Sequence, residues 1–148
     1  MKFSQLAIYI NEIEQTSSRL KMTHLLAELF KKLHADEIDK TIYLLQGRVV
    51  PLYEKTEFGM AEKMLIKSVT TALHLEKKYF EHEYKKIGDI GKTVEHFKKT
   101  YKSLEEKDLD IKEVYERLLE VAKKSGTGSQ DAKGSIIGHL VSQLDPLS

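Results

Sequence analysis

Apolar residues recur at helical spacing along nearly the whole chain. In residues 2–15 they lie three or four positions apart, which is the pattern of a helix with one buried face: Phe3, Leu6, Ala7, Ile10 and Ile13. The hydroxyl-rich Thr16-Ser17-Ser18 interrupts this pattern, because short hydroxyl side chains favour helix caps over helix interiors. A second helix is predicted over about 18–33, with these residues pointing inward: Leu20, Leu25, Leu26, Leu29, Phe30 and Leu33.

Six further segments show the same periodicity. Their expected ranges are 36–47, 59–74, a stretch around Phe80, 89–101, 111–124 and a last helix from 129 to about 144. Asp36, Asp89 and Ser129 are the expected N-caps, and Gly47 is an expected stop. No segment alternates apolar and polar residues over the length of a strand. The chain is therefore predicted to be all-α, a compact single domain of seven or eight short helices over residues 1–148.

Composition narrows the class of protein. The 148 residues carry 24 Lys and Arg against 23 Asp and Glu, so the net charge of +1 argues against bulk electrostatic binding to nucleic acid. The absence of Cys excludes disulfides, thiolate zinc sites and a Cys nucleophile. No apolar run approaches the length of a membrane span, and the amino terminus lacks the pattern of a secretory signal. We expect a cytoplasmic protein with no membrane partner.

The common catalytic motifs are missing from the sequence. The six histidines form no HExxH or other close ligand pair: His24, His34, His74, His82, His96 and His139. The Gly126-Thr127-Gly128-Ser129 stretch fits neither a Walker A loop nor a Rossmann turn, and no Gly-x-Ser-x-Gly elbow occurs. We therefore assign no catalytic residue and no metal ligand, and expect no cofactor to bind this chain.

Two short segments combine free backbone groups with positive charge. In the first, Ser17 precedes a predicted helix whose first turn carries Arg19 and Lys21. A helix start offers unpaired N–H groups and a positive dipole end, which suit a phosphate oxygen and disfavour cations unless an anion is expected there. The alternative is an ordinary Ser N-cap followed by surface cations.

The second segment is Lys123–Lys133. Gly126 and Gly128 allow a tight turn and a close approach of another backbone, Ser129 is the expected N-cap, and Lys133 lies one turn into the helix. Together these groups form a small phosphate-binding unit. The alternative is a C-cap glycine followed by a new N-cap. Tyr and Phe fall on apolar stripes, which favours core packing over a platform for stacking bases, so the residues alone predict a helical module that holds duplex DNA by its phosphates.

At these same positions the sequence resembles the N-terminal DNA-binding domain of ATP-dependent DNA ligases, most closely the archaeal-type enzymes. Five blocks carry the resemblance in order: Phe3-Ser4-Gln5-Leu6 through Ile13-Glu14-Gln15-Thr16-Ser17-Ser18-Arg19-Leu20-Lys21-Met22; Ile42-Tyr43-Leu44-Leu45-Gln46-Gly47-Arg48 with Pro51; Glu57-Phe58-Gly59-Met60-Ala61; Lys86-Ile87-Gly88-Asp89-Ile90-Gly91; and Gly126-Thr127-Gly128-Ser129-Gln130-Asp131-Ala132-Lys133. They cover nearly the whole chain.

The resemblance implies an all-helical domain that lies across the minor groove on both sides of a nick. It implies backbone contacts from the first segment and from the second: Ser17, Arg19, Lys21, Gly126, Gly128, Ser129 and Lys133. The parent ligase would use ATP and Mg²⁺ to join 3′-hydroxyl and 5′-phosphate ends in replication, repair and recombination. Its partners would be nicked double-stranded DNA and the catalytic domains of the same ligase.

The chain departs from the family in what it lacks. The catalytic Lys-x-Asp-Gly motif of the nucleotidyltransferase domain does not occur, and the oligonucleotide-binding fold that follows it is absent. We therefore expect the N-terminal part of a prokaryotic ligase, unable to adenylate or seal alone. Two alternatives stay open: a helical protein–protein interaction module without DNA binding, and a small enzyme with a deep pocket of convergent titratable groups.

Overall fold

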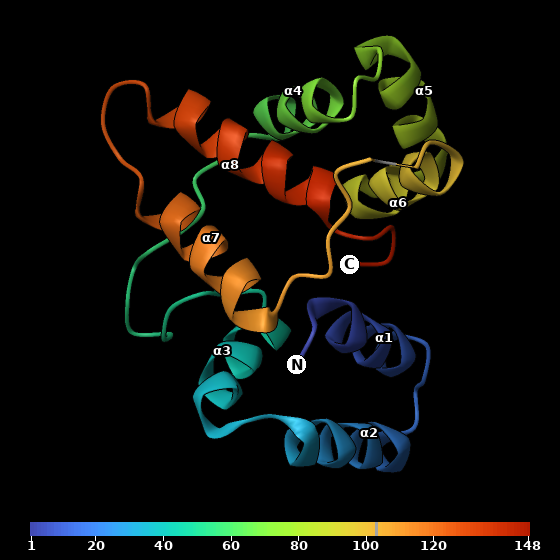
Figure 1. Ribbon diagram of the computed structural model, residues 1–148, viewed down its shortest axis with the longest axis vertical. Coiled ribbons are helices and arrows are strands. Elements are labelled where there is room, and N and C mark those ends of the chain that lie inside the picture. The colour runs from blue at the N-terminus through green and yellow to red at the C-terminus, as the bar shows by residue number, and fades with distance from the viewer. Residues whose placement is uncertain (103) are drawn as a thin grey trace.

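A computed structural model describes residues 1–102 and 104–148, and these residues form eight helices and no strand (Figure 1). The helices are α1 (Phe3–Glu14), α2 (Arg19–Lys32), α3 (Ala35–Leu45), α4 (Glu62–Ala72), α5 (Lys77–Ile87), α6 (Ile90–Thr100), α7 (Ile111–Lys123) and α8 (Ser129–Gln143). The predicted all-α class is confirmed. None of the helices in the described part of the chain is long and apolar enough to span a bilayer.

The helices form two groups that α7 and α8 connect. Figure 1 shows α1, α2 and α3 at one end of the long axis and α4, α5 and α6 at the other. The first group packs around Leu6 and Leu29, which are fully buried, and the second packs around Phe80 and Val69. Leu140 of α8 contacts Val114 of α7 between the two groups, so the core is continuous through this pair of helices.

Two glycines allow α4 and α8 to pack at close range. A β-carbon at Gly138 would lie 2.9 Å from the carbonyl oxygen of Ser68 and 3.0 Å from the Ala72 β-carbon, and one at Gly134 would meet the Ser68 hydroxyl. Because Gly134 faces Met64 and Ser68 while Gly138 faces Ser68 and Ala72, the two helices run in the same direction. Their N-termini therefore lie at the same end of the pair.

A buried lysine holds the C-terminal end of α8. Lys98 of α6 is 3% exposed, and its ammonium donates hydrogen bonds to the carbonyl oxygens of Val141 and Leu144. A cation at this position complements the unpaired carbonyls and the negative end of the helix dipole. Burial lowers the pKa of Lys98, and the nearby carboxylates of Glu106 and Asp145 only partly oppose that shift.

A buried carboxylate ties the start of the chain to α3. Glu37 accepts hydrogen bonds from the amino-terminal group of Met1 and from the backbone N–H of His34, the latter at 2.9 Å. Burial raises the pKa of Glu37, but the hydrogen bonds from these two donors outweigh it, so the net pKa lies below its usual range. The residue before α3 is thus His34, and the expected cap Asp36 lies inside the first turn instead.

The predicted cap of α6 is confirmed, whereas the predicted burial of the aromatic side chains is only partly correct. Asp89 caps α6 as predicted, accepting a hydrogen bond of 2.8 Å from the Lys92 N–H. The expectation that aromatic side chains pack in the core is wrong for Tyr53, Tyr79 and Tyr101, which are 85%, 66% and 62% exposed. Tyr53 lies in a turn, Tyr79 lies on the outer face of α5, and Tyr101 follows the last residue of α6. Helical periodicity did not identify these positions as exposed.

Replacing Gly138 by Ala is expected to lower the free energy of unfolding by about 1–3 kcal/mol, because the new methyl meets backbone atoms of α4 that cannot move alone. The gain in helix propensity, about 1 kcal/mol, offsets only part of this loss. Urea unfolding midpoints measure the difference. The matched control is Ser135→Ala on the exposed face of α8, and a Gly138→Ala midpoint equal to wild type would contradict the close packing.

Glu37→Gln is expected to remove a contribution to stability that depends on pH. Since the folded-state pKa of Glu37 lies below its ordinary 4.5, the contribution is complete above that value and is lost as pH falls through the lower, folded-state pKa. The difference in unfolding free energy between wild type and variant should therefore be largest above pH 4.5 and shrink as the pH falls below it. Urea titrations across this range test it; a difference independent of pH would rule out the ionised pair as its source.

Candidate nucleic-acid interface

The start of α2 presents two cations beside a capped helix end. The Ser18 hydroxyl accepts a hydrogen bond of 3.2 Å from the Lys21 N–H, so the serine N-cap given as the alternative for this segment is present. Ser17, Arg19 and Lys21 are all exposed, and the first turn contains no acidic residue. Within the described residues, neither cation forms a salt bridge. Positive side chains and the positive helix end thus coincide, which favours an external anion.

Leu20 lies between these cations and is 70% exposed, so the prediction that it points inward is wrong. The buried residues of α2 are Leu25 and Leu29. Five residues correspond to about 500° of helix, so Leu20 lies about 140° around the axis from Leu25. Leu20 therefore lies outside the apolar stripe that faces the core, although its spacing in the sequence is close to that of the stripe.

The second segment folds as a glycine turn that leads into α8. Gly126 and Gly128 have φ values of +90° and +78°, a left-handed conformation that favours glycine. Gly128, and not Ser129, occupies the N-cap position, so the predicted cap is wrong. Ser129 is the first residue of α8, so its side chain does not occupy the cap position. Its N–H donates a hydrogen bond of 3.2 Å to the Gly126 carbonyl, across the turn.

Lys133 is buried, with 6% of its surface exposed, and its ammonium is bound by the chain itself. It donates a hydrogen bond of 2.7 Å to the Phe58 carbonyl, while the Gln130 side chain donates one of 2.9 Å to the Gly59 carbonyl. These bonds fasten the segment that precedes α4 to the first turns of α8. Direct contact of Lys133 with DNA stays a prediction, since the ammonium here is committed to backbone.

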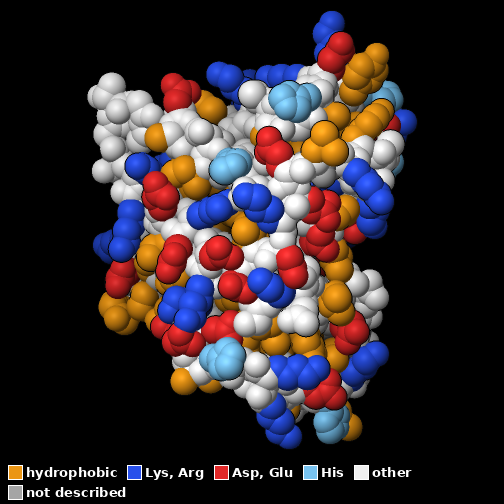
Figure 2. Space-filling model, viewed as in Figure 1, with side chains coloured by type: hydrophobic (Ala, Val, Ile, Leu, Met, Phe, Trp, Pro, Cys, Tyr) orange, Lys and Arg blue, Asp and Glu red, His pale blue; other side chains and the backbone are white. Residues whose placement is uncertain are grey.

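The structure separates the two predicted segments. Figure 1 shows the start of α2 and the glycine turn at opposite ends of the molecule. The start of α4 lies beside the start of α8, because the two helices are parallel. The helix itself was predicted over 59–74, but its position beside α8 was not. Gly59, which precedes this helix, has a φ of +59°, a left-handed conformation that favours glycine. Figure 2 shows Lys and Arg mixed with Asp and Glu over the visible face.

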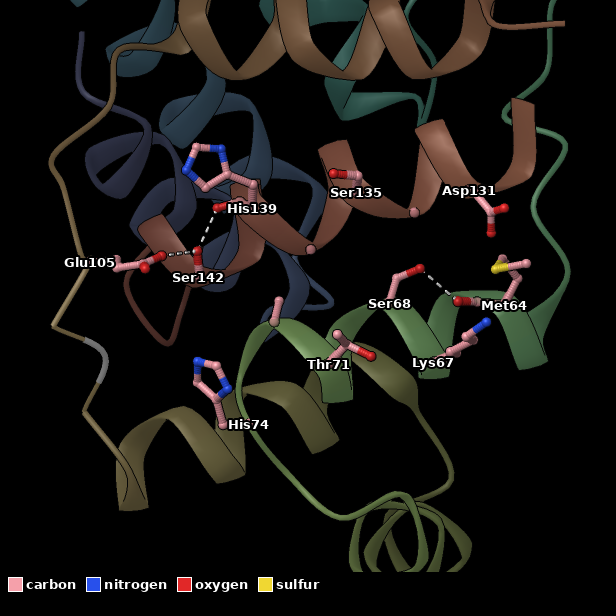
Figure 3. A pocket seen from close by; sticks show the side chains of 13 residues that line it. Met64, Lys67, Ser68, Thr71, His74, Glu105, Asp131, Ser135, His139 and Ser142 are labelled. Atoms are coloured by element: carbon pink, nitrogen blue, oxygen red, sulfur yellow. Dashed lines mark hydrogen bonds between the residues drawn. The ribbon is translucent and has the colours of Figure 1, made fainter. Parts of the chain in front are cut away.

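A cleft of about 440 Å³ lies between α4 and α8. Figure 3 shows Glu105, Ser142 and His139 at one end of it and Lys67 and Asp131 at the other. The Ser142 hydroxyl lies 3.0 Å from a Glu105 carboxylate oxygen and 2.7 Å from the His139 carbonyl oxygen, so it is not paired with an imidazole. The described residues hold no cluster of three potential metal ligands. None of the predicted site residues lines this cleft.

Comparison with known proteins gives a consistent result over the whole chain. The profile of the family described as "DNA ligase N terminus" matches residues 2–148. A protein described as "Probable DNA ligase" from Dictyoglomus thermophilum is 42% identical over 99% of this chain and 24% of its own length. The "DNA ligase" proteins of Nitrosopumilus maritimus and Pyrobaculum calidifontis are 39% and 38% identical over 99% of this chain, which covers 25% and 26% of them. The chain thus spans about a quarter of the length of these relatives.

Ser18→Ala and Ser129→Ala are expected to differ in their effects on stability. Loss of the α2 cap should cost about 1 kcal/mol of unfolding free energy, because the Lys21 N–H loses its acceptor. Ser129→Ala should leave the unfolding midpoint nearly unchanged, since its hydroxyl caps no helix. Urea unfolding of both variants measures the difference, and a larger cost at Ser129 than at Ser18 would contradict the capping assignment.

Proposed function

The chain belongs to the DNA ligase N-terminal family, and from this membership we propose that it binds nicked duplex DNA through the sugar–phosphate backbone, without reading base sequence. The observation that carries the proposal is the start of α2, where exposed Arg19 and Lys21 lie at a positive helix end without a carboxylate partner among the described residues. Such an arrangement is stabilised when a phosphate binds, because the anion offsets the repulsion between the cations and the helix dipole.

The glycine turn supplies the second contact in this proposal. Gly126 and Gly128 are exposed and have no atom near their missing β-carbons, so a phosphate can approach their backbone amides. The Ser129 hydroxyl caps no helix and is available as a donor. Lys133 contributes in the proposal by holding Phe58 and Gly59 against α8, and it contacts phosphate only if it leaves that carbonyl.

The separation of the two contacts suggests how the domain positions a substrate. Weak contacts at opposite ends of the molecule hold a duplex at two places along its length. A nick held between them is fixed relative to the rest of the enzyme, which reduces the entropic cost of reaching a reactive geometry. In this proposal the domain orients DNA and takes no chemical step.

The joining chemistry is assigned to the remaining three quarters of the relatives' length. The parent would seal 3′-hydroxyl and 5′-phosphate ends in replication, repair and recombination, with ATP and Mg²⁺ as cofactors. The residues of this chain do not fit those groups, because the sequence has no Lys-x-Asp-Gly motif and the described residues form no acidic cluster for a cation. The other partner in the proposal is the catalytic part of the same ligase.

Arg19→Ala is expected to weaken DNA binding to a similar degree for duplexes of different sequence and to reduce the slope of log affinity against log salt by about one. Fluorescence anisotropy at several salt concentrations measures both quantities. The matched control is Lys31→Ala, an exposed lysine in the last turn of the same helix, which should change the slope less.

The outcomes separate the function from the site. If wild type binds no duplex even at low salt, DNA binding by this chain is wrong and a helical interaction module becomes the better interpretation. If wild type binds but Arg19→Ala and Lys31→Ala behave alike, the chain binds DNA through other residues.

A further inference from the structure

Two exposed tyrosines line one pocket between α5 and α6. Tyr79 of α5 and Tyr101, which follows α6, are 66% and 62% exposed, and both line a pocket of about 260 Å³ that we call the tyrosine pocket. Figure 1 shows the two helices side by side, at the end of the molecule away from α2. The sequence predicts core packing for aromatic side chains, and the structure instead places these two rings at one concave site.

The aromatic lining of the tyrosine pocket is anchored in the core. Phe97 lines the pocket and is buried, and its ring stacks on the fully buried Phe80 ring with centroids 5.7 Å apart. The His96 ring, which also lines the pocket, meets the Phe97 ring edge-on with centroids 5.4 Å apart. A lining fixed in this way receives a flat ligand at little cost in conformational entropy.

The size of the tyrosine pocket limits what it holds. Pockets for drug-sized ligands measure about 300–1,000 Å³, and this one is smaller, so it suits a single planar ring system. A nucleobase is such a ring system, and it stacks on tyrosine whatever its identity, because every base has a π-face.

Two carboxylates suit the edge of a base that has no pairing partner. Glu76 and Glu83 both line the tyrosine pocket. The Glu83 carboxylate lies 3.5 Å from the Lys86 ammonium and 4.0 Å from a His96 ring nitrogen, while Glu76 forms no salt bridge within the described residues. Carboxylates accept hydrogen bonds from the N–H groups of a base edge, and in a duplex the pairing edge is already occupied by the opposite base.

The charges around the tyrosine pocket favour a polyanion. Residues 75–102 carry eight Lys against five Asp and Glu, whereas the whole chain carries 24 Lys and Arg against 23 Asp and Glu. Lys78 and Lys102, each next in sequence to one of the two tyrosines, are exposed and form no salt bridge in the part of the chain that the structure describes. An arginine of a partner protein also stacks on tyrosine, but these cations repel a basic partner and attract phosphates.

We propose that the tyrosine pocket binds one unpaired base of a DNA strand, with the base against Tyr79 and Tyr101 and the neighbouring phosphates at Lys78 and Lys102. This inference rests on the proposed DNA binding and adds a substrate feature to it. A gap or a single-stranded overhang offers an unpaired base, whereas an intact duplex does not. The start of α2 belongs to the other group of helices, so the duplex contact at Arg19 and the base contact here are separate.

The test measures binding of a labelled single-stranded oligothymidylate and of a blunt duplex by fluorescence anisotropy. The double variant Tyr79→Ser with Tyr101→Ser should bind the single strand about tenfold more weakly, because stacking is lost, and should bind the duplex as wild type does. The double variant Tyr79→Phe with Tyr101→Phe keeps both rings and should bind the single strand as wild type does. The matched control is Tyr53→Ser, which removes an 85% exposed tyrosine outside the pocket and should change neither affinity.

The remaining outcomes each reject a stated claim. The inference is overturned if wild type binds the duplex but not the single strand, or if the serine double variant keeps wild-type affinity for the single strand. It is also overturned if the phenylalanine variant, or Tyr53→Ser, loses as much affinity as the serine double variant. Displacement of the strand by arginine amide but not by deoxyadenosine monophosphate assigns the pocket to a protein partner instead. A wild type that binds neither DNA removes the proposed function as well. Unfolding midpoints of all variants ensure that only folded proteins are compared.

Discussion

The close contact between α4 and α8 is the constraint on which the arrangement of this domain depends. Gly134 and Gly138 leave no room for a β-carbon, since one at Gly134 would overlap the Ser68 hydroxyl and one at Gly138 would lie 2.9 Å from the Ser68 carbonyl oxygen. At this close spacing of the two helices the Lys133 ammonium reaches the Phe58 carbonyl, and the segment before α4 is held against α8. A larger residue at either glycine would move α4 away, and the turn and helix starts at this end of the molecule would separate with it.

Local sequence signals predicted the helices but not the contacts between them. The apolar stripes and the caps at Ser18 and Asp89 depend on residues within one turn of each other, so the sequence displays them directly. Burial of Lys133 depends on the Phe58 carbonyl, 75 positions away in the chain, and no residue near Lys133 in the sequence indicates that contact. In the sequence alone, Gly134 and Gly138 only lower the helix propensity of their segment. Their role in close packing becomes visible when α4 is seen to face them.

The candidate site was predictable to a similar extent. The cations at Arg19 and Lys21 and the glycines of the second segment are visible as sequence features, and the structure leaves them exposed. Exposure of Leu20 follows from helical geometry once Leu25 and Leu29 are known to be buried, because Leu20 lies on the other side of the axis. Exposure of Leu52 and Tyr53 was not predictable, because they lie outside the helices, where helical periodicity does not determine burial. With a net charge of only +1, the proposed DNA binding depends on where the charges lie on the surface and not on their sum.

The pairing of α4 with α8 also bears on how the chain reaches its native state. Residues 73–128 separate the two helices, whereas α1 with α2 and α5 with α6 are neighbours both in sequence and in space. Contacts between sequence neighbours close short loops and form quickly, while the α4–α8 contact must close a long one. We therefore expect the ends of the domain to acquire structure first and the docking of α8 against α4 to be the slower step of folding.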